Sequence, residues 1–138
     1  MADVLSLEVA TPAGLKLSTE ANAVEVPSVS GEFGVLPGHI PVLAALRCGA
    51  VRYDIGGKEH VFAVGPGFAE ANATRVRLLT DLFALPENID KPAVENELAE
   101  ANEALKAFGA LHEGHEYEEL QRAVDWAKAR LDAVDLSH

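Results

Sequence analysis

The residues able to do chemistry do not form a recognisable catalytic set. Cys48, the single cysteine, follows an arginine that could lower its pKa, but a lone small residue at a strand edge is more often structural. His112 and His115, with Glu113 and Glu116, could ligate zinc, yet they lie in a glycine-flanked loop without a second rigid pair of ligands. We therefore expect no catalytic residue, no cofactor and no metal site.

A segment with a different character covers residues 31–43, Gly-Glu-Phe-Gly-Val-Leu-Pro-Gly-His-Ile-Pro-Val-Leu. Three glycines and two prolines make it rigid, and its aliphatic side chains make it apolar. Loops that hold apolar groups in fixed positions often face a partner protein. The sequence therefore favours interaction over catalysis.

Composition limits the classes of function. The chain has 138 residues, the length of about one domain, and 49% of them are hydrophobic, enough for a packed core. Acidic residues outnumber basic ones 22 to 11, which argues against nucleic acid and anionic lipid as partners. One cysteine fits a reducing compartment. We expect neither a targeting peptide nor a membrane-inserted segment.

The two parts of the chain, residues 1–86 and 87–138, have different compositions, and we expect a domain boundary between them. The first part holds nine of the eleven glycines and six of the seven prolines, with short alternating apolar runs between turns. This pattern predicts a β-sandwich or barrel, including a hairpin at Gly56-Gly57. The second part holds ten alanines and 13 acids against five bases, which is typical of helices.

Two helices are predicted in the second part, the first capped by Asp90 with Pro92 in its first turn. Each carries an apolar seam with spacings of three and four residues. The seam positions pair so that their numbers add to 225, which predicts an antiparallel hairpin folding back between His112 and Glu113. The predicted pairs are Val94 with Leu131, Leu98 with Ala127, Ala101 with Val124, Leu105 with Leu120, and Phe108 with Tyr117.

Trp126, the single tryptophan, falls roughly opposite the seam of the second helix, beside Ala129 and Ala133. An indole on an otherwise charged helix face is poorly suited to full exposure, and small neighbours let another surface approach. We therefore expect Trp126 to dock on the flank of the β-sandwich. The alternative is an incidental exposed aromatic side chain.

Residues 31–53, together with Val-Gly-Pro-Gly-Phe-Ala-Glu-Ala at residues 64–71, resemble the signature of the epsilon subunit of bacterial F-type ATP synthases. The order of β-rich and helical parts and the length extend the likeness over essentially the whole chain. Ala44 departs from the pattern, because many members have threonine there.

The resemblance implies a fold and a place. The fold is a ten-stranded β-sandwich followed by a two-helix hairpin. The place is the central rotor stalk, where this non-catalytic subunit joins gamma to the c-ring and couples proton flow to ATP synthesis, with the extended hairpin reaching the alpha/beta head to restrain hydrolysis. The implied location is peripheral, on the cytoplasmic face of a bacterial inner membrane, although a plastid-encoded homologue would also fit.

The resemblance also implies partner contacts. Glu32 and Phe33 would approach the c-ring. The residues that follow would lie at or near the gamma and c-ring contacts: His39, Ile40, Pro41, Val42 and Leu43.

Some family members bind ATP through an Ile/Leu-Asp-x-x-Arg-Ala motif at the start of the first helix. Here Ile89 and Asp90 are kept, but Ala93 and Val94 replace the arginine and alanine. The loss of a planar guanidinium removes a strong phosphate ligand, so we expect no bound nucleotide.

Two other classes of function stay open at this point. One is a free-standing β-sandwich binding module with a helical interaction tail. The other is an enzyme whose site is not visible in the sequence.

Overall fold

The structure, a computed structural model, describes residues 4–108 and 114–137, and in these ranges ten strands are followed by a short 3-10 helix and two α-helices. The strands are β1 (Leu5–Thr11), β2 (Gly14–Ala21), β3 (Ala23–Ser28), β4 (Gly31–Val35), β5 (Val42–Leu46), β6 (Gly49–Ile55), β7 (Lys58–Val64), β8 (Gly67–Ala71), β9 (Arg75–Thr80) and β10 (Phe83–Ala84). The helices are η1 (Pro86–Asn88), α1 (Lys91–Ala107) and α2 (His115–Leu136). The predicted fold class is confirmed. The predicted fold-back between His112 and Glu113 lies outside the described residues.

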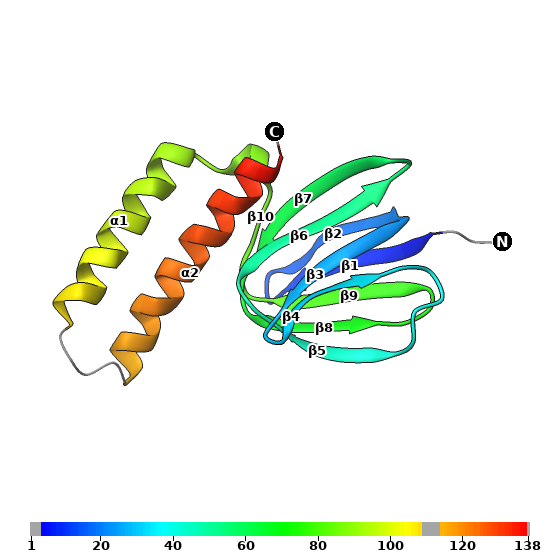
Figure 1. The fold of residues 1–138 in the computed structure, drawn as a ribbon, viewed down its shortest axis with the longest axis horizontal. Helices are drawn as coiled ribbons and strands as arrows, with labels where there is room; N and C mark the ends of the chain where they lie inside the picture. Colours follow the sequence, from blue (N-terminus) through cyan, green and yellow to red (C-terminus); the bar gives the residue numbers. More distant parts are fainter. Residues whose placement is uncertain (1–3, 109–113, 138) are drawn as a thin grey trace.

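The strands form two layers that are joined through β3 (Figure 1). Their order is β10-β7-β6-β3-β5-β8-β9-β1-β2, with β4 on the other edge of β3. Residues 23–25 of β3 pair with β6, whereas Ser28 pairs with Leu46 of β5, so β3 carries the hydrogen bonding from one layer to the other. All pairs are antiparallel except β1 with β9.

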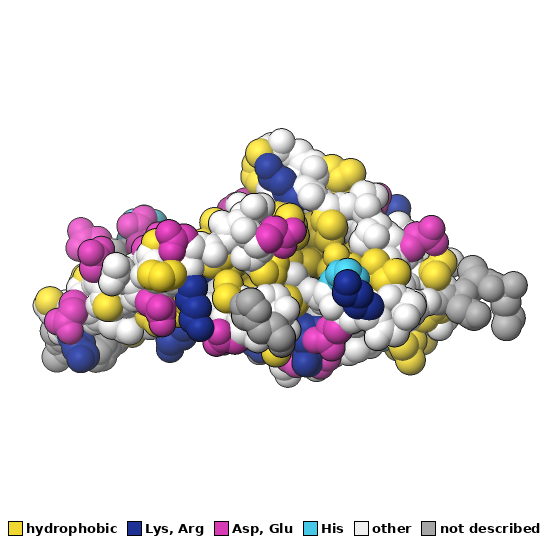
Figure 2. Space-filling view, turned by 90° about the horizontal axis from the view of Figure 1, so that it is seen from above, with side chains coloured by type: hydrophobic (Ala, Val, Ile, Leu, Met, Phe, Trp, Pro, Cys, Tyr) yellow, Lys and Arg dark blue, Asp and Glu magenta, His cyan; other side chains and the backbone are white. Residues whose placement is uncertain are grey.

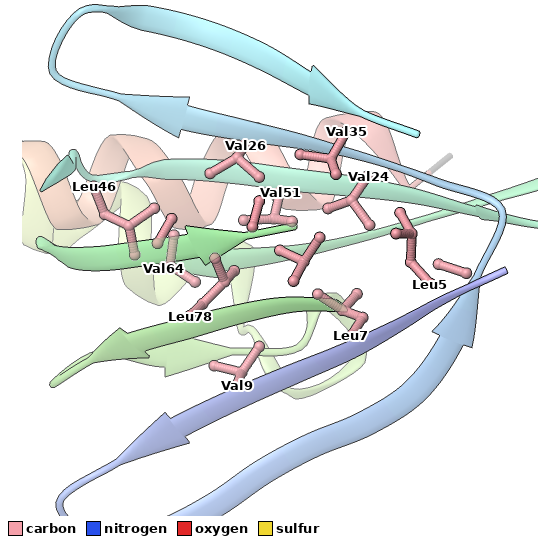
Figure 3. Close-up of a cluster of buried hydrophobic side chains, with 14 of the residues drawn as sticks. Leu5, Leu7, Val9, Val24, Val26, Val35, Leu46, Val51, Val64 and Leu78 are labelled. Atoms are coloured by element: carbon pink, nitrogen blue, oxygen red, sulfur yellow. The ribbon is translucent and has the colours of Figure 1, made fainter. Parts of the chain in front are cut away.

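Alternate residues of the strands fill a single interior between the layers (Figure 3). In β1, for example, Leu5, Leu7 and Val9 are fully buried while the residues between them are partly exposed. The same alternation brings in Val24 and Val26 from β3 and residues from β4 to β9. A strand presents successive side chains to opposite faces, so each buried row leaves an outward row that must face solvent or a partner.

The turn between β6 and β7 has the predicted chemistry. Gly56 and Gly57 have φ values of 60° and 85°, which is the left-handed region favoured by glycine. Two successive residues of this kind give the tight turn whose twist matches a hairpin. The turn sets the register that places Tyr53 beside His60, whose rings stack with centroids 5.1 Å apart.

The hairpin of helices lies against one end of the sandwich, with α2 between α1 and the strands (Figure 1). Contacts link α2 to α1 on one side and to β6 and β7 on the other. The junction is ordered, because β10 pairs with β7 and η1 touches both β7 and α2. Neither helix, in the ranges described, has a stretch apolar enough to cross a membrane.

Only glycine fits at position 67, because the backbone of β9 lies too close for a side chain. A Cβ at this position would overlap the backbone carbonyl oxygen of Leu79, whereas a Cβ at Gly34 would meet nothing within 4 Å. We expect Gly67→Ala to lower the free energy of unfolding by about 3 kcal/mol, because backbone in the middle of a sheet must move. Gly34→Ala, the matched control, should change it by less than about 0.5 kcal/mol. Urea unfolding followed by circular dichroism measures both, and equal stability of the two variants would contradict the reading of Gly67.

Candidate interaction surfaces

The turn between β3 and β4 presents the first of the predicted partner contacts. Ser28 is buried, and its hydroxyl donates to the carbonyl oxygen of Gly31 at 2.5 Å and accepts from the backbone N–H of Ser30 at 3.2 Å. These bonds hold the turn and leave Val29 exposed at its tip. Glu32 follows on β4, opposite Pro27. The turn is therefore a firm support for two outward side chains.

Glu32 belongs to a chain of alternating charges on the outer face of β3, β4 and β6. Arg52 Nη2 lies 2.6 Å from Glu25 Oε2 and 3.6 Å from Glu32 Oε2, and Arg47 Nη2 lies 3.9 Å from Glu32 Oε1. All four side chains are partly exposed, so each pair contributes little to stability. Their effect is to orient the carboxylate of Glu32 rather than to hold the fold together.

Phe33 and Val42 have a different position from Glu32. Both are partly buried and pack against the interior of the sandwich. Phe33 pairs with Val26 of β3, whose side chain is fully buried. The contact of Phe33 or Val42 with a partner would therefore be limited to the part of each side chain left at the surface.

The remaining predicted contacts lie in and after the loop between β4 and β5. Gly38, with φ of 92°, donates its N–H to the carbonyl oxygen of Ala73 at 2.8 Å, which ties this loop to the β8–β9 turn. His39 Nδ1 donates to the carbonyl oxygen of Ile40 at 2.6 Å. Ile40 is 75% exposed, and Pro41 is also exposed. Because β4 separates this loop from the β3–β4 turn, Glu32 and the His39–Pro41 stretch lie toward opposite ends of the sandwich.

An apolar row that sequence reasoning missed crosses the outer face of the layer β5-β8-β9-β1-β2. The register places Ala45 beside Phe68, Phe68 beside Leu79, Leu79 beside Ala10, and Ala10 beside Leu15. Phe68, Leu79 and Leu15 are exposed, and so is Leu43, two residues from Ala45 on β5. We call Leu15, Leu43, Phe68 and Leu79 the apolar face. The sequence of β8, Gly-Phe-Ala-Glu-Ala at 67–71, could have indicated this face. Its buried residues are alanines, whereas its large side chain, Phe68, is exposed.

The residues predicted for the seam of the helical hairpin are all buried or partly buried. Val94, Val124 and Ala127 are buried, and Leu98, Ala101, Leu105, Phe108, Tyr117, Leu120 and Leu131 are partly buried. The rings of Phe108 and Tyr117 are 5.8 Å apart between centroids. Two ion pairs join the helices, Lys91 with Asp135 at 3.0 Å and Glu97 with Arg130.

Trp126 lies where α2 meets the sandwich. It is partly buried and packs with a cluster made of Val61 and Ala63 of β7 and Ala129 and Ala133 of α2. The opposite side of α2 carries Val124 and Ala127 of the seam. Helix α2 is thus apolar on two sides, one toward α1 and one toward the strands.

Cys48 borders the same contact, because it packs against the cluster that holds Trp126. Burial, and after it the nearby Asp125 carboxylate, raise the pKa of its thiol from 9.0 to about 11, although Arg122 and Arg47 act in the opposite direction. A thiol of this kind is almost wholly protonated at neutral pH and is a poor nucleophile.

Asp90 serves the helix rather than a ligand. Its carboxylate accepts a hydrogen bond from the backbone N–H of Ala93 at 3.3 Å, so it is the N-cap of α1, as expected from the sequence. Ile89 is partly buried at the end of η1. Across residues 4–108 and 114–137, no group of three histidine, cysteine or acidic side chains could hold a metal ion. His112 and Glu113 lie outside those ranges.

Comparisons with known proteins identify the family. Residues 4–85 match the model of the ATP synthase delta/epsilon chain β-sandwich domain. The ATP synthase epsilon chain of Magnetococcus marinus is 39% identical over 98% of this chain and 97% of that protein, and the epsilon chain of Solibacter usitatus is 38% identical over 98% of both. This chain belongs to the ATP synthase epsilon chain family. The family predicted from residues 31–53 and 64–71 is confirmed.

Solved structures show the same fold at lower identity. A chain of the Euglena gracilis mitochondrial ATP synthase, in a structure of OSCP, F1 and c-ring, aligns with a TM-score of 0.80 over 96% of this chain and 82% of that chain, at 22% identity. A chain of the Tetrahymena thermophila mitochondrial ATP synthase central stalk and c-ring aligns with a TM-score of 0.59 at 9% identity. As an epsilon chain, the protein is a non-catalytic subunit of ATP synthase, as predicted, and the enzyme alternative is not supported.

The raised pKa of Cys48 predicts slow alkylation. Only the thiolate reacts, so iodoacetamide at pH 8 should modify the folded chain on the order of 100-fold more slowly than the urea-unfolded chain. The pH midpoint of the rate should lie near 11 in the folded chain and near 9 in urea. Because the folded state holds its proton more tightly, stability should fall as pH rises from 9 to 11 and be unaffected by this group below pH 9. A folded-state midpoint near 9 would contradict the burial of the thiol.

Proposed function

We propose that this chain is the rotor subunit that joins gamma to the c-ring and transmits torque between them. The observation that carries the proposal is a rigid sandwich, of the epsilon family, with apolar residues exposed in fixed positions on its outside. A subunit that turns with its neighbours needs contacts that do not deform under load, and strands paired on both sides supply them. Membership of the ATP synthase family argues against a free-standing binding module.

The surface we assign to gamma is the apolar face together with His39, Ile40 and Pro41. Leu43 is 68% exposed and Phe68 57%, so both lose substantial surface when covered. The face also carries charge, because Glu70 lies between Leu43 and Arg77 in the register, and Arg77 pairs with Glu8 at 3.2 Å. An apolar centre with charged groups beside it is the usual anatomy of a protein interface.

The surface we assign to the c-ring is the β3–β4 turn, with Glu32 as its polar contact and Val29 as its apolar one. Arg47 and Arg52 hold the Glu32 carboxylate in place before the partner arrives, which lowers the entropy cost of binding. Phe33 supports the turn from the inside. This division puts the c-ring and the His39–Pro41 loop at opposite ends of β4.

For the hairpin we propose a regulatory role, in which α1 and α2 leave the sandwich and reach the alpha/beta head. Trp126 would dock on β7 in the folded-down state and change partner on extension. The division at residues 86 and 87 fits this role, because the family match ends at residue 85 and η1 begins at Pro86. Most acidic side chains of the two helices are exposed, and several are visible on the face drawn in Figure 2, so a partner for the extended hairpin must tolerate or neutralise them. We place the subunit peripherally, on the cytoplasmic face of a bacterial inner membrane.

A charge on the apolar face should weaken the bond to gamma. We expect Phe68→Glu to reduce affinity for the host's gamma subunit roughly 30-fold, because a carboxylate would have to lose its water in an apolar contact. Ile55→Glu, on the β6–β7 hairpin and 40% exposed, is the matched control and should bind as the original chain does. Isothermal titration calorimetry with purified gamma measures the affinity of both variants. If the two variants bind gamma alike, the apolar face is not its docking surface.

ATP should not bind to the isolated chain at physiological concentration. Ala93 has no charge for the phosphates, and the Asp90 carboxylate is occupied as the cap of α1. Addition of about 1 mM ATP should therefore leave the thermal unfolding midpoint unchanged, because only a ligand that binds the folded state raises it. Magnesium without nucleotide is the control. A rise of several degrees with ATP would show that other side chains supply the site.

A further inference from the structure

Two ion pairs cross between α1 and α2, and they differ in their surroundings. Lys91 and Asp135 meet near the open end of the hairpin, where both side chains are about half exposed. Arg130, which pairs with Glu97, is only 16% exposed. The guanidinium of Arg130 is therefore largely shielded from water, whereas the Glu97 carboxylate that it binds is 55% exposed.

Arg130 also reaches Trp126, one turn earlier on α2. Its guanidinium carbon lies 5.2 Å from the centroid of the indole ring, a cation–π contact, and its Nε donates to the carbonyl oxygen of Trp126 at 3.4 Å. One side chain thus touches α1 through Glu97 and the docking residue through the ring. Because the guanidinium is planar, it can make both contacts at once.

Trp126 is the largest side chain in the contact with the sandwich. Its neighbours in the cluster are Ala129 and Ala133 on α2 and Ala63 and Val61 on β7. Alanines bring backbones close but bury little area, so the indole supplies most of the apolar surface that α2 contributes to this cluster. The orientation of the ring therefore decides how well α2 is held.

We propose that Arg130 is a latch that couples the pairing of α1 with α2 to the docking of α2 on the sandwich. With Glu97 in place, Arg130 is held over the indole and keeps the ring against β7. When the Glu97 contact is lost, the guanidinium turns to solvent, the ring loses its cover, and docking weakens although no sandwich residue has changed. The hairpin is then held closed and docked as one unit. This coupling belongs to the isolated chain, so it can fail or hold independently of the proposed rotor role.

The test uses Glu97→Gln, which removes the charge of a residue on α1 that acts on the docking cluster only through Arg130. Cys48 reports docking, because it packs against the same cluster as Trp126 and its thiol is partly buried there. We expect Glu97→Gln in the full chain to raise the rate of iodoacetamide reaction at pH 8 by about 5-fold or more. Lys91→Gln breaks the other interhelical pair, remote from Trp126, and should leave the rate within about 2-fold.

Further variants separate the latch from a general loosening of the helices. Arg130→Gln should raise the Cys48 rate at least as much as Glu97→Gln, and adding Glu97→Gln to it should have no further effect, because the two residues act as a pair. Arg130→Lys, which keeps the charge and loses the planar stack, should fall between. Acrylamide quenching of Trp126, the single tryptophan, should rise in the same order. Circular dichroism checks that each variant keeps its helices.

Two results would overturn the proposal. In the first, Glu97→Gln and Lys91→Gln change the Cys48 rate equally, which would mean that any loss of helix pairing loosens docking. In the second, Glu97→Gln leaves both the Cys48 rate and Trp126 quenching at their original values, which would mean that docking does not depend on Arg130 being held from α1.

Discussion

The structure depends on one constraint, that alternate residues of ten short strands must fill a single interior. Once Leu5, Leu7 and Val9 of β1 point inward, the residues between them must point out, and the same holds for each strand hydrogen-bonded to its neighbour. A slip of one residue would turn every buried side chain to the surface, so the register is strongly fixed. The outward rows, including the apolar face, are therefore as rigidly placed as the core itself. A surface of this kind suits a subunit that must pass on force.

Helix α2 packs against two neighbours, with α1 on one side and the strands β6 and β7 on the other. Its seam toward α1 uses Val124 and Ala127, and its other side uses Ala129, Ala133 and Trp126. Small side chains allow both approaches, but they bury little surface, so neither contact is strong by itself. Coupling through Arg130 lets two modest contacts support each other. It also means that a change at one contact is felt at the other.

Local periodicity was enough to predict much of this fold. The spacing of apolar residues predicted the two helices, and Gly56-Gly57 predicted the β6–β7 turn, in which both φ values are positive. The side of α2 that carries Trp126 also followed from the helical repeat. Asp90 was readable as a cap because its type and its place before Pro92 are those of a helix start.

Other features could not be read locally. The apolar face joins residues of β1, β2, β5, β8 and β9, which are neighbours only because β1 pairs in parallel with β9, far along the chain. Phe33 and Val42 looked like surface residues of a rigid loop, but the alternation of their strands turns them toward the core. No pattern in the sequence singled out Arg130, because one of its contacts is with Trp126, one turn earlier on α2, and the other is with Glu97 on α1. Such sites depend on the register between elements, which periodicity within one element does not contain.

The free energy of the contact between α2 and the sandwich limits any movement of the hairpin. Release of α2 would uncover Val61 and Ala63 on β7 together with the indole of Trp126, and uncovered apolar surface costs free energy in proportion to its area. The released state can be populated substantially only if another surface covers this area or if differential binding elsewhere repays the loss. The acidic exterior of α1 and α2 limits which surfaces could bind the released hairpin, because such a surface must also accept negative charge. In an isolated chain the hairpin should therefore remain docked on the sandwich, and its release requires binding to a partner.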